Sequence, residues 1–185
     1  MKTLEQDFSF CRAKAKNGGR WIDGYYVRHL PYTPSPLYSS PEALEEELKQ
    51  EEKDTIHYLA TEGFSDWNMP RDVELVEIDK RTVCRCVNIE VPSEHRGKIY
   101  KHPVYEGDVV KFNKYPKVFK FIPEERGFKM ANTEDLLIDD DFNLIPKNEW
   151  SPWQQVDDQW LREFNGEDTW LLGNIYDNPE LIEHI

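Results

Sequence analysis

Two cysteines and two histidines near the middle of the chain are the residues whose types best suit metal chemistry. Cys84 and Cys86 are two positions apart, so on a strand their side chains share one face. With His95 and His102 they would supply four ligands for Zn²⁺. The ligand pairs of zinc fingers are typically separated by about two to four residues, and this spacing does not fit that pattern. We therefore predict no metal site, and we expect cysteines that are buried or half-buried.

An acidic run, DDDFN at 139–143, has the composition of a calcium-binding loop. When Asp139 is taken as position one of an EF-hand, position six is Leu144 and position twelve is Trp150. The EF-hand needs glycine and glutamate at those two positions. The run is therefore predicted to be a solvated acidic loop.

Motifs of known enzyme classes are missing from the sequence. It contains no nucleophile elbow, no phosphate-binding glycine loop and no dinucleotide-binding fingerprint. Five histidines are scattered among 36 acidic residues, so their spacing does not single out an acid–base pair. We predict a protein that is not an enzyme, with no catalytic residue and no cofactor.

A basic segment from residue 95 to residue 120 is the feature most suggestive of binding. It has seven basic residues against Glu106 and Asp108, a net charge of +5. The candidate interaction surface consists of four of its lysines, Lys111, Lys114, Lys117 and Lys120. They are interleaved with aromatic residues in a predicted β-meander over 108–130, a composition typical of a platform for single-stranded nucleic acid.

Two other interpretations of the basic segment remain open. Strand alternation by itself sends the aromatic residues Phe112, Tyr115, Phe119 and Phe121 to the core and the lysines to water. Alternatively, the segment meets an acidic surface on a second copy of the chain, such as the stretch 42–54, which has seven acidic and two basic residues. The net charge of −13 makes nucleic acid the less favoured partner.

The first half of the chain shows one helix among strands. Ser40 precedes Pro41 and acidic residues, which predicts a helix over 41–52. Its apolar face is thin, with only Ala43, Leu44 and Leu48, so we expect it to lie on the surface or to pack its few leucines against a neighbour. Strands are predicted over 21–28, 55–60, 73–78 and 82–89. The polar stretch 91–101 is expected to cross between two halves of the protein.

The second half is predicted to be a β-meander followed by helices. Runs of strand-forming residues cover 109–112, 118–122 and 128–131, with turn compositions between them. Ser151 and Gln154 form a capping box, and Trp153, Val156 and Trp160 follow at helical spacing, which predicts a helix over 152–164. A strand over 169–172 and a short helix capped by Asn178 complete the chain.

Several of these stretches together resemble the YopX family of phage and prophage proteins. The resemblance rests mainly on EGDVVK at 106–111 and GNIYDNPEL at 173–181. Further matching stretches are RA at 12–13, WIDGYYV at 21–27, ID at 78–79 and TV at 82–83. The chain departs from the family pattern over 84–97 and 31–53. The resemblance implies a β-rich, oligomeric protein with an SH3-like barrel, encoded by mobile elements and with no established biochemical activity. It carries no catalytic residue over to this chain.

The expected architecture is therefore mainly β (α+β). It comprises a β-rich N-terminal subdomain over 1–92 and an SH3-like barrel over 93–185 with an inserted helix and a short C-terminal helix. The expected function is that of a phage-encoded accessory protein that forms a homo-oligomer and binds a host or phage protein. Three cysteines, no long apolar run and no signal peptide favour the cytoplasm of a bacterial host and no membrane.

Overall fold

A computed structural model of the protein describes residues 10–34, 40–62, 73–125, 127–156 and 169–185. These residues are mainly β, with antiparallel sheets and a single α-helix, which confirms the predicted class. The chain divides into two compact units, Met1–Val83 and Cys84–Ile185. The predicted boundary after residue 92 instead falls within a strand, Cys84–His95.

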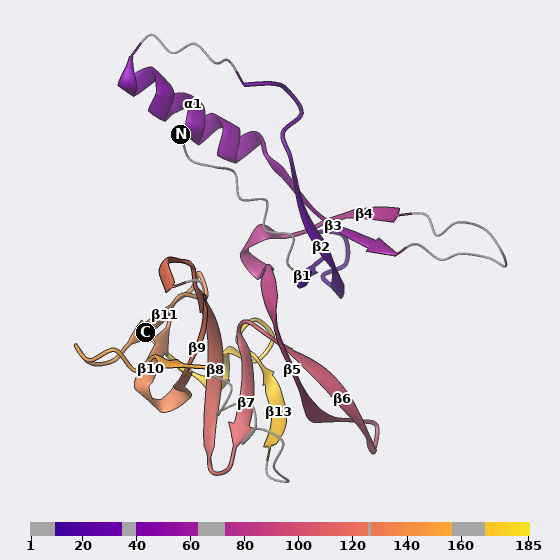
Figure 1. The fold of residues 1–185 in the computed structure, drawn as a ribbon, viewed down its shortest axis with the longest axis vertical. Helices are drawn as coiled ribbons and strands as arrows, with labels where there is room; N and C mark the ends of the chain where they lie inside the picture. Colours follow the sequence, from indigo (N-terminus) through magenta and orange to yellow (C-terminus); the bar gives the residue numbers. More distant parts are fainter. Residues whose placement is uncertain (1–9, 35–39, 63–72, 126, 157–168) are drawn as a thin grey trace, which may run out of the picture. The chain divides into compact units, whose positions relative to one another are not determined.

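The N-terminal unit contains four antiparallel strands in the order β4-β3-β2-β1 (Figure 1). They are β1 (Phe10–Lys14), β2 (Trp21–His29), β3 (Ile56–Glu62) and β4 (Val73–Glu77). The strands predicted over 21–28, 55–60 and 73–78 are confirmed to within two residues at each end. An antiparallel bridge between Ala15 and Ile78 connects the chain after β1 to the chain after β4. The core of this unit is made by Cys11, Ala13, Leu59 and Ile78.

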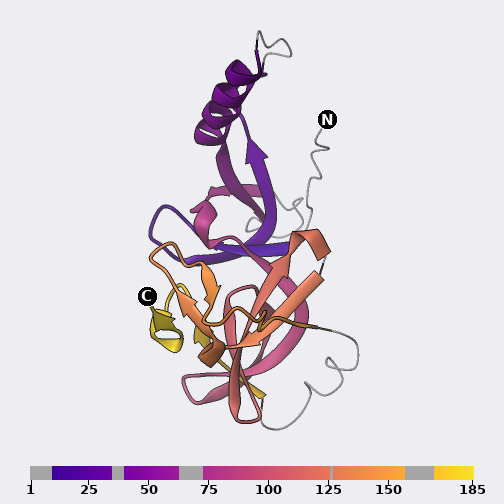
Figure 2. The same cartoon turned by 90° about the vertical axis from the view of Figure 1, so that its left-hand side faces the viewer.

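The helix α1 (Pro41–Asp54) forms as the sequence predicts. The Ser40 side chain accepts a hydrogen bond from the Ala43 backbone N–H at 3.2 Å, and Pro41 occupies the first turn, where no donor is needed. The structure describes every residue of α1, and none of them is buried. Figures 1 and 2 show α1 projecting beyond the ends of β2 and β3. The prediction of a surface helix is confirmed.

The C-terminal unit opens with a long hairpin of β5 (Cys84–His95) and β6 (Lys98–Tyr105). The stretch 91–101, predicted to cross between two halves, is therefore paired strand. Its turn is Arg96-Gly97, and both residues have positive φ, 52° and 73°. Two such residues are what a tight hairpin turn requires, but Arg-Gly is not among the strong sequence signals for it.

The predicted meander is confirmed in the five-stranded sheet, whose order is β12-β9-β8-β7-β13. Its strands are β7 (Asp108–Phe112), β8 (Tyr115–Ile122), β9 (Gly127–Asn132), β12 (Gln154–Gln155) and β13 (Thr169–Asn174). Successive residues along its strands pack into two separate apolar clusters. Val109 and Val118 belong to the cluster that includes Leu136 and Ile138, whereas Val110 and Phe119 belong to the cluster that includes Val104.

A second, smaller sheet supplies the other side of the first cluster. It is ordered β11-β10-β14, with β10 (Leu136–Ile138), β11 (Leu144–Pro146) and β14 (Glu183–His184). The strand β14 runs parallel to β10. Short 3-10 turns cover Lys80–Thr82, Pro123–Glu125, Thr133–Asp135 and Pro179–Leu181.

Both predicted C-terminal helices need correction. Within 152–164, the described residues 152–156 contain the strand β12, and 157–164 lie outside the described residues. The Val156 N–H donates to the Phe128 carbonyl at 3.2 Å, so this backbone pairs with β9. At the chain end only Pro179–Leu181 is helical, and the Ile185 N–H then donates to the Ile138 carbonyl at 3.1 Å. In both places hydrogen bonds to a neighbouring strand outweigh the local capping pattern.

Candidate functional site

The four candidate lysines do not share one face of the sheet. Lys117 is opposite Val110, and Lys111 is opposite Pro116 in the β7–β8 register. Because side chains alternate along a strand, Lys117 shares the face of Val110, whereas Lys111 and Lys120 lie on the opposite face. Lys114 lies in the turn between β7 and β8 and is exposed. The predicted surface is therefore split in two.

Lys117 is buried, with only 8% of its surface exposed. Its Nζ donates to Asn132 Oδ1 at 2.9 Å. Burial lowers the pKa of the Lys117 ammonium, and the charge of Asp135 opposes that shift. Lys120 is half-buried, with Nζ 5.8 Å from the centroid of the Trp153 ring. Of the four lysines, Lys111 and Lys114 are the fully exposed ones.

The aromatic residues between these lysines are largely used for packing. Phe119 is buried in the core, and Phe112 is half-buried against it. Phe121 makes an edge contact with Phe128 at 5.2 Å between ring centroids, and the Arg85 guanidinium lies 4.0 Å from the Phe121 ring centroid. Tyr115, beside the β7–β8 turn, is exposed. This pattern matches the alternation of core and solvent faces more closely than a continuous stacking platform.

The cysteines and histidines singled out by the sequence do not converge. Cys84 is buried and Cys86 is half-buried, both near the start of β5, whereas His95 is at the end of that strand. Cys86 and His95 are nine positions apart, a span of roughly 30 Å along a straight strand. His102 is opposite Val91 in β6, with its Nε2 4.0 Å from Asp108 Oδ2. In the described part of the chain, no group of three or more His, Cys, Asp or Glu residues is arranged to hold a metal ion.

The acidic run forms the loop between β10 and β11. Within this loop, the carboxylate of Asp139 accepts hydrogen bonds from neighbouring loop residues. The Asp139 Oδ1 accepts hydrogen bonds from the backbone N–H groups of Asp141 and Asn143 at 2.9 Å and 2.8 Å. The Asn143 Nδ2 donates to Oδ2 at 2.9 Å. These hydrogen bonds lower the pKa of Asp139, and the bond from the Asn143 side chain has the largest effect. Asp140 and Asp141 are exposed, so the expectation of a solvated loop is confirmed.

The two stretches with the strongest family resemblance, 106–111 and 173–181, lie side by side. The strands β7 and β13 pair so that Asn174 is opposite Asp108. The Ile175 N–H donates to the Gly107 carbonyl at 3.0 Å. The Asn174 Oδ1 in turn accepts from the Tyr176 and Asp177 backbone N–H groups, both at 3.0 Å. The paired stretches thus connect the turn before β7 to the end of β13 within the C-terminal unit.

Both carboxylates of the first stretch are bonded to backbone. Asp108 is 1% exposed, and its Oδ2 accepts from the Tyr105 N–H at 2.8 Å. The Glu106 Oε1 accepts from the Phe121 N–H at 3.1 Å. Burial raises the pKa of Glu106, against the opposing effects of that hydrogen bond and of Arg85. Gly107 between them has φ of 80°, a conformation that favours glycine. These residues shape the backbone of the turn before β7.

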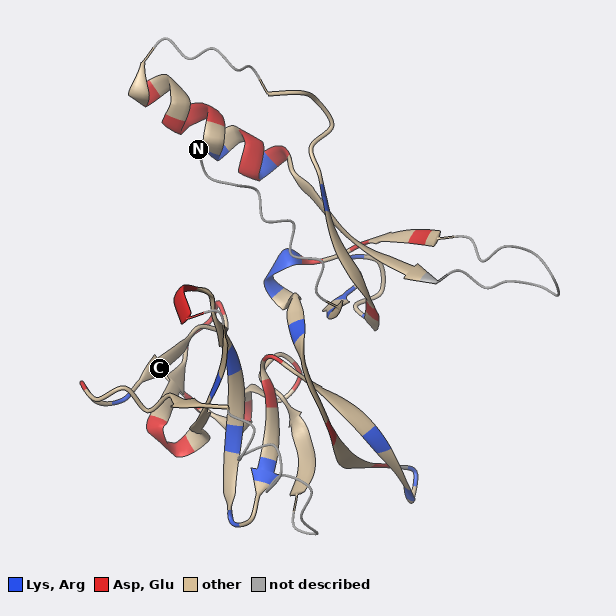
Figure 3. Cartoon of the chain, in the orientation of Figure 1, with Lys and Arg blue, Asp and Glu red and all other residues tan. Residues whose placement is uncertain are grey.

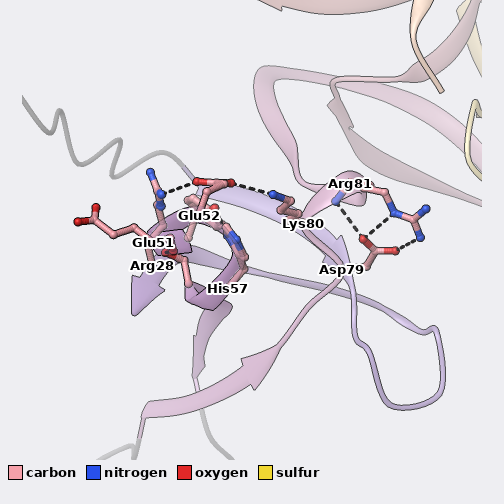
Figure 4. A network of polar contacts seen from close by, with 9 residues as sticks. Arg28, Glu51, Glu52, His57, Asp79, Lys80 and Arg81 are labelled. Atoms are coloured by element: carbon pink, nitrogen blue, oxygen red, sulfur yellow. Dashed lines mark hydrogen bonds and ion pairs between the residues drawn. The ribbon is translucent and has the colours of Figure 1, made fainter. Parts of the chain in front are cut away.

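A network of charged side chains in the N-terminal unit was not predicted from the sequence (Figure 4). The Glu52 carboxylate lies between Arg28 Nη2 at 3.0 Å and Lys80 Nζ at 2.7 Å. The hydrogen bond from Lys80, together with the charges of Lys80 and Arg28, lowers the pKa of Glu52. The network connects the last turn of α1 to β2 and to the 3-10 turn after β4. Its members are exposed, so it attaches the helix and encloses no cavity.

His57 and Tyr26 form the most chemically suggestive pair near this network. The Tyr26 hydroxyl is 2.5 Å from His57 Nδ1, and the two rings are stacked. Burial, and then the charge of Lys80, lower the pKa of His57, which favours the neutral form of the ring. Its Nε2 is buried and has no hydrogen-bond partner among the described residues. A buried nitrogen cannot exchange a proton with a substrate in solvent, so the pair is best explained by packing.

Two exposed projections of opposite charge remain. The acidic helix α1 carries red residues along much of its length in Figure 3. The end of the β5–β6 hairpin, which we call the hairpin tip (residues 96–101), carries Arg96, Lys98 and Lys101, and the facing end of β5 adds Glu94 opposite Ile99. Figures 1 and 2 show this tip extending away from the β7–β9 meander of its own unit.

Comparisons with known proteins do not identify a relative. No protein-family model, curated protein or solved structure matches the chain. In the described residues, no helix is long and apolar enough to cross a membrane.

Proposed function

We propose that this protein is a non-enzymatic, phage- or prophage-encoded accessory protein that self-associates and binds a host or phage protein. The observation that carries the proposal is α1, a helix of fourteen residues without a buried residue. Most helices in folded proteins are stabilised by packing an apolar face, because isolated helices of this length are marginal in water. A helix held at its last turn by Glu52 is therefore suited to gain further stability from a partner.

The charges and the sequence resemblance support the same proposal. Helix α1 has seven acidic and two basic residues, whereas the hairpin tip has three basic residues with Glu94 on the facing strand. Complementary charges of this kind favour specific association and raise its rate. The resemblance to the YopX family is the reason for proposing a phage origin and an SH3-like barrel that includes the C-terminal sheets. The bacterial cytoplasm is part of the same proposal.

The self-association is tested by the molar mass of the purified chain over a range of concentrations, at low and at high salt. A mass that rises with concentration above 22.0 kDa and falls at high salt is expected, because salt screens exposed charges. A chain that stays a monomer under both conditions would remove this part of the proposal. Capture from host lysate, with identification of the bound protein and nucleic acid, tests the partner.

A second candidate function is the binding of single-stranded nucleic acid at the β7–β8 turn. Lys111, Lys114 and the aromatic ring of Tyr115 are exposed there. An exposed aromatic residue beside lysines is able to stack on a base and contact the backbone phosphates. The burial of Lys117 and the net charge of −13 make this candidate weaker than self-association.

A further inference from the structure

The hairpin tip exposes large apolar side chains together with its basic residues. Four consecutive residues, Lys98 to Lys101, are all exposed. Ile99 is 67% exposed and Tyr100 is 52% exposed. Arg96, in the turn, is exposed as well. The tip therefore offers both apolar and charged side chains for contacts with a partner.

The apolar residues of the tip lie on both faces of a two-stranded ribbon. Ile99 is opposite Glu94 and Tyr100 is opposite Ser93. Since neighbouring side chains point to opposite faces, Ile99 and Tyr100 cannot be covered by the same layer of their own chain. A two-stranded hairpin without a covered face is marginally stable in water. A partner that covers either face of the tip would therefore stabilise it.

Pairing two β6 edges so that the apolar residues Ile99 and Tyr100 face each other is an unfavourable way to cover the tip. If Ile99 were opposite Tyr100 of a second copy, Lys98 would be opposite Lys101, and like charges directly opposite each other repel. Pro103 also lacks an N–H group for a strand ladder. Lysine and proline are the residues that commonly protect edge strands from such pairing. The tip is therefore better suited to side-chain contacts with an acidic surface.

Helix α1 has the complementary chemistry. Leu48 is 52% exposed, and Glu45, one turn before it, is exposed too. Glu45 pairs with Lys49 at 2.8 Å, an exposed pair that a stronger basic partner can replace at little cost. On the hairpin side, Lys101 lies 3.9 Å from Glu90, a similarly weak exposed pair.

We infer that the hairpin tip of one chain docks on α1 of a second copy, with Ile99 or Tyr100 against Leu48 and the tip lysines against the helix carboxylates. This inference rests on the proposed self-association and assigns the surfaces that carry it. Each chain has one tip and one helix, so each copy supplies both partners of the contact.

Two charge-reversed variants of the full chain test the contact. Lys98→Glu with Lys101→Glu changes the tip, and Glu45→Lys with Glu46→Lys changes the helix. Each is expected to raise the dissociation constant at least tenfold at low salt and to give a mass near 22.0 kDa. The matched control is Lys111→Glu with Lys114→Glu, which makes the same charge change on other exposed residues and is expected to leave the mass of the assembly unchanged. Circular dichroism confirms that each variant is folded.

Mixing the tip variant with the helix variant gives the decisive measurement. In a mixed pair each acidic tip meets a basic helix and each basic tip meets an acidic helix, so assembly is expected to return. No recovery in the mixture, or full assembly of either variant alone, would overturn the inference while leaving self-association intact. A wild-type chain that is monomeric throughout would remove the proposed self-association itself. Loss of oligonucleotide binding in the tip variant alone would assign the tip to nucleic acid and also overturn the inference.

Discussion

The backbone N–H of Ile175 donates to the carbonyl oxygen of Gly107 at 3.0 Å. These residues are 68 positions apart in the sequence, and they belong to the two stretches with the strongest family resemblance. An added Cβ on Gly107 would lie 3.1 Å from Cε2 of the Tyr176 ring. The turn at Gly107 and the end of β13 therefore fit together closely, and the turn depends on glycine at position 107.

Gly107→Ala is expected to destabilise the protein by about 1–3 kcal/mol, since alanine is strained at a φ of 80° and would also press on Tyr176. Urea unfolding measures the loss. Gly97→Ala is the matched control, because its φ is 73° but nothing lies within 4 Å of the added Cβ. Gly97→Ala therefore introduces the backbone strain without a close contact to a neighbouring side chain. Equal losses in the two variants would show that the close fit with Tyr176 is unimportant.

Glu106→Gln is expected to stabilise the protein at pH 7. Burial raises the pKa of Glu106 above 4.5, so the folded protein binds this proton more tightly than the unfolded chain does. The resulting stabilisation is present below pH 4.5 and is lost as the pH rises through the folded-state pKa. Glutamine keeps an oxygen for the Phe121 N–H and carries no charge.

The measurement for Glu106 is the free energy of unfolding of both proteins from pH 4 to pH 8. The advantage of the glutamine variant is expected to shrink as the pH falls through the folded-state pKa. The exposed Glu124→Gln serves as the control. A glutamine variant that is less stable at pH 7 would mean that the attraction of Arg85 outweighs the cost of burial.

Glu52→Gln is expected to loosen the attachment of α1. The pKa of Glu52 is lowered, so its contribution to stability is present above pH 4.5 and is lost as the pH falls through the folded-state pKa. The carboxylate is about half exposed, so the loss of global stability at pH 7 is only about 0.5–1 kcal/mol. Hydrogen exchange of the α1 amides should become faster. Glu46→Gln, on the same helix, is the control, and an equal effect there would contradict a special role for Glu52.

Lys117→Glu is expected to lower the free energy of unfolding by about 1–3 kcal/mol, because it removes the hydrogen bond to Asn132 and buries a carboxylate near Asp135. Lys111→Glu changes an exposed residue and should have little effect on stability. Thermal unfolding of the two variants separates these outcomes. Similar stability in both would show that Lys117 tolerates a reversed charge despite its burial.

If the second candidate function holds, the wild-type chain is expected to bind a labelled single-stranded oligonucleotide weakly at low salt. The double variant Lys111→Glu with Lys114→Glu should then abolish this binding. Phosphate contacts make such binding fall steeply with salt. No retention of the oligonucleotide by the wild-type chain at low salt would exclude this function. Lys117 is unsuitable for this experiment, since its substitution also affects stability.

Local patterns in the sequence were sufficient for the elements that depend on near neighbours. The N-cap serine and Pro41 determine where α1 begins, because those bonds are formed within one turn. Runs of strand formers separated by turn residues gave the meander β7–β9 for the same reason. The separation of charge between the acidic helix and the basic middle segment is likewise a property of the sequence alone.

Tertiary structure decided whatever depends on a distant partner. Residues 154–155 became a strand because β9 offers backbone groups to pair with, although their local pattern favours a helix. The buried position of Lys117 follows from the register of β7 against β8, which a list of lysines does not contain. The attachment of Glu52 to Arg28 and Lys80 likewise joins residues more than twenty positions apart. Sequence patterns specify propensity and charge, whereas hydrogen-bond partners and burial are settled only when remote segments meet.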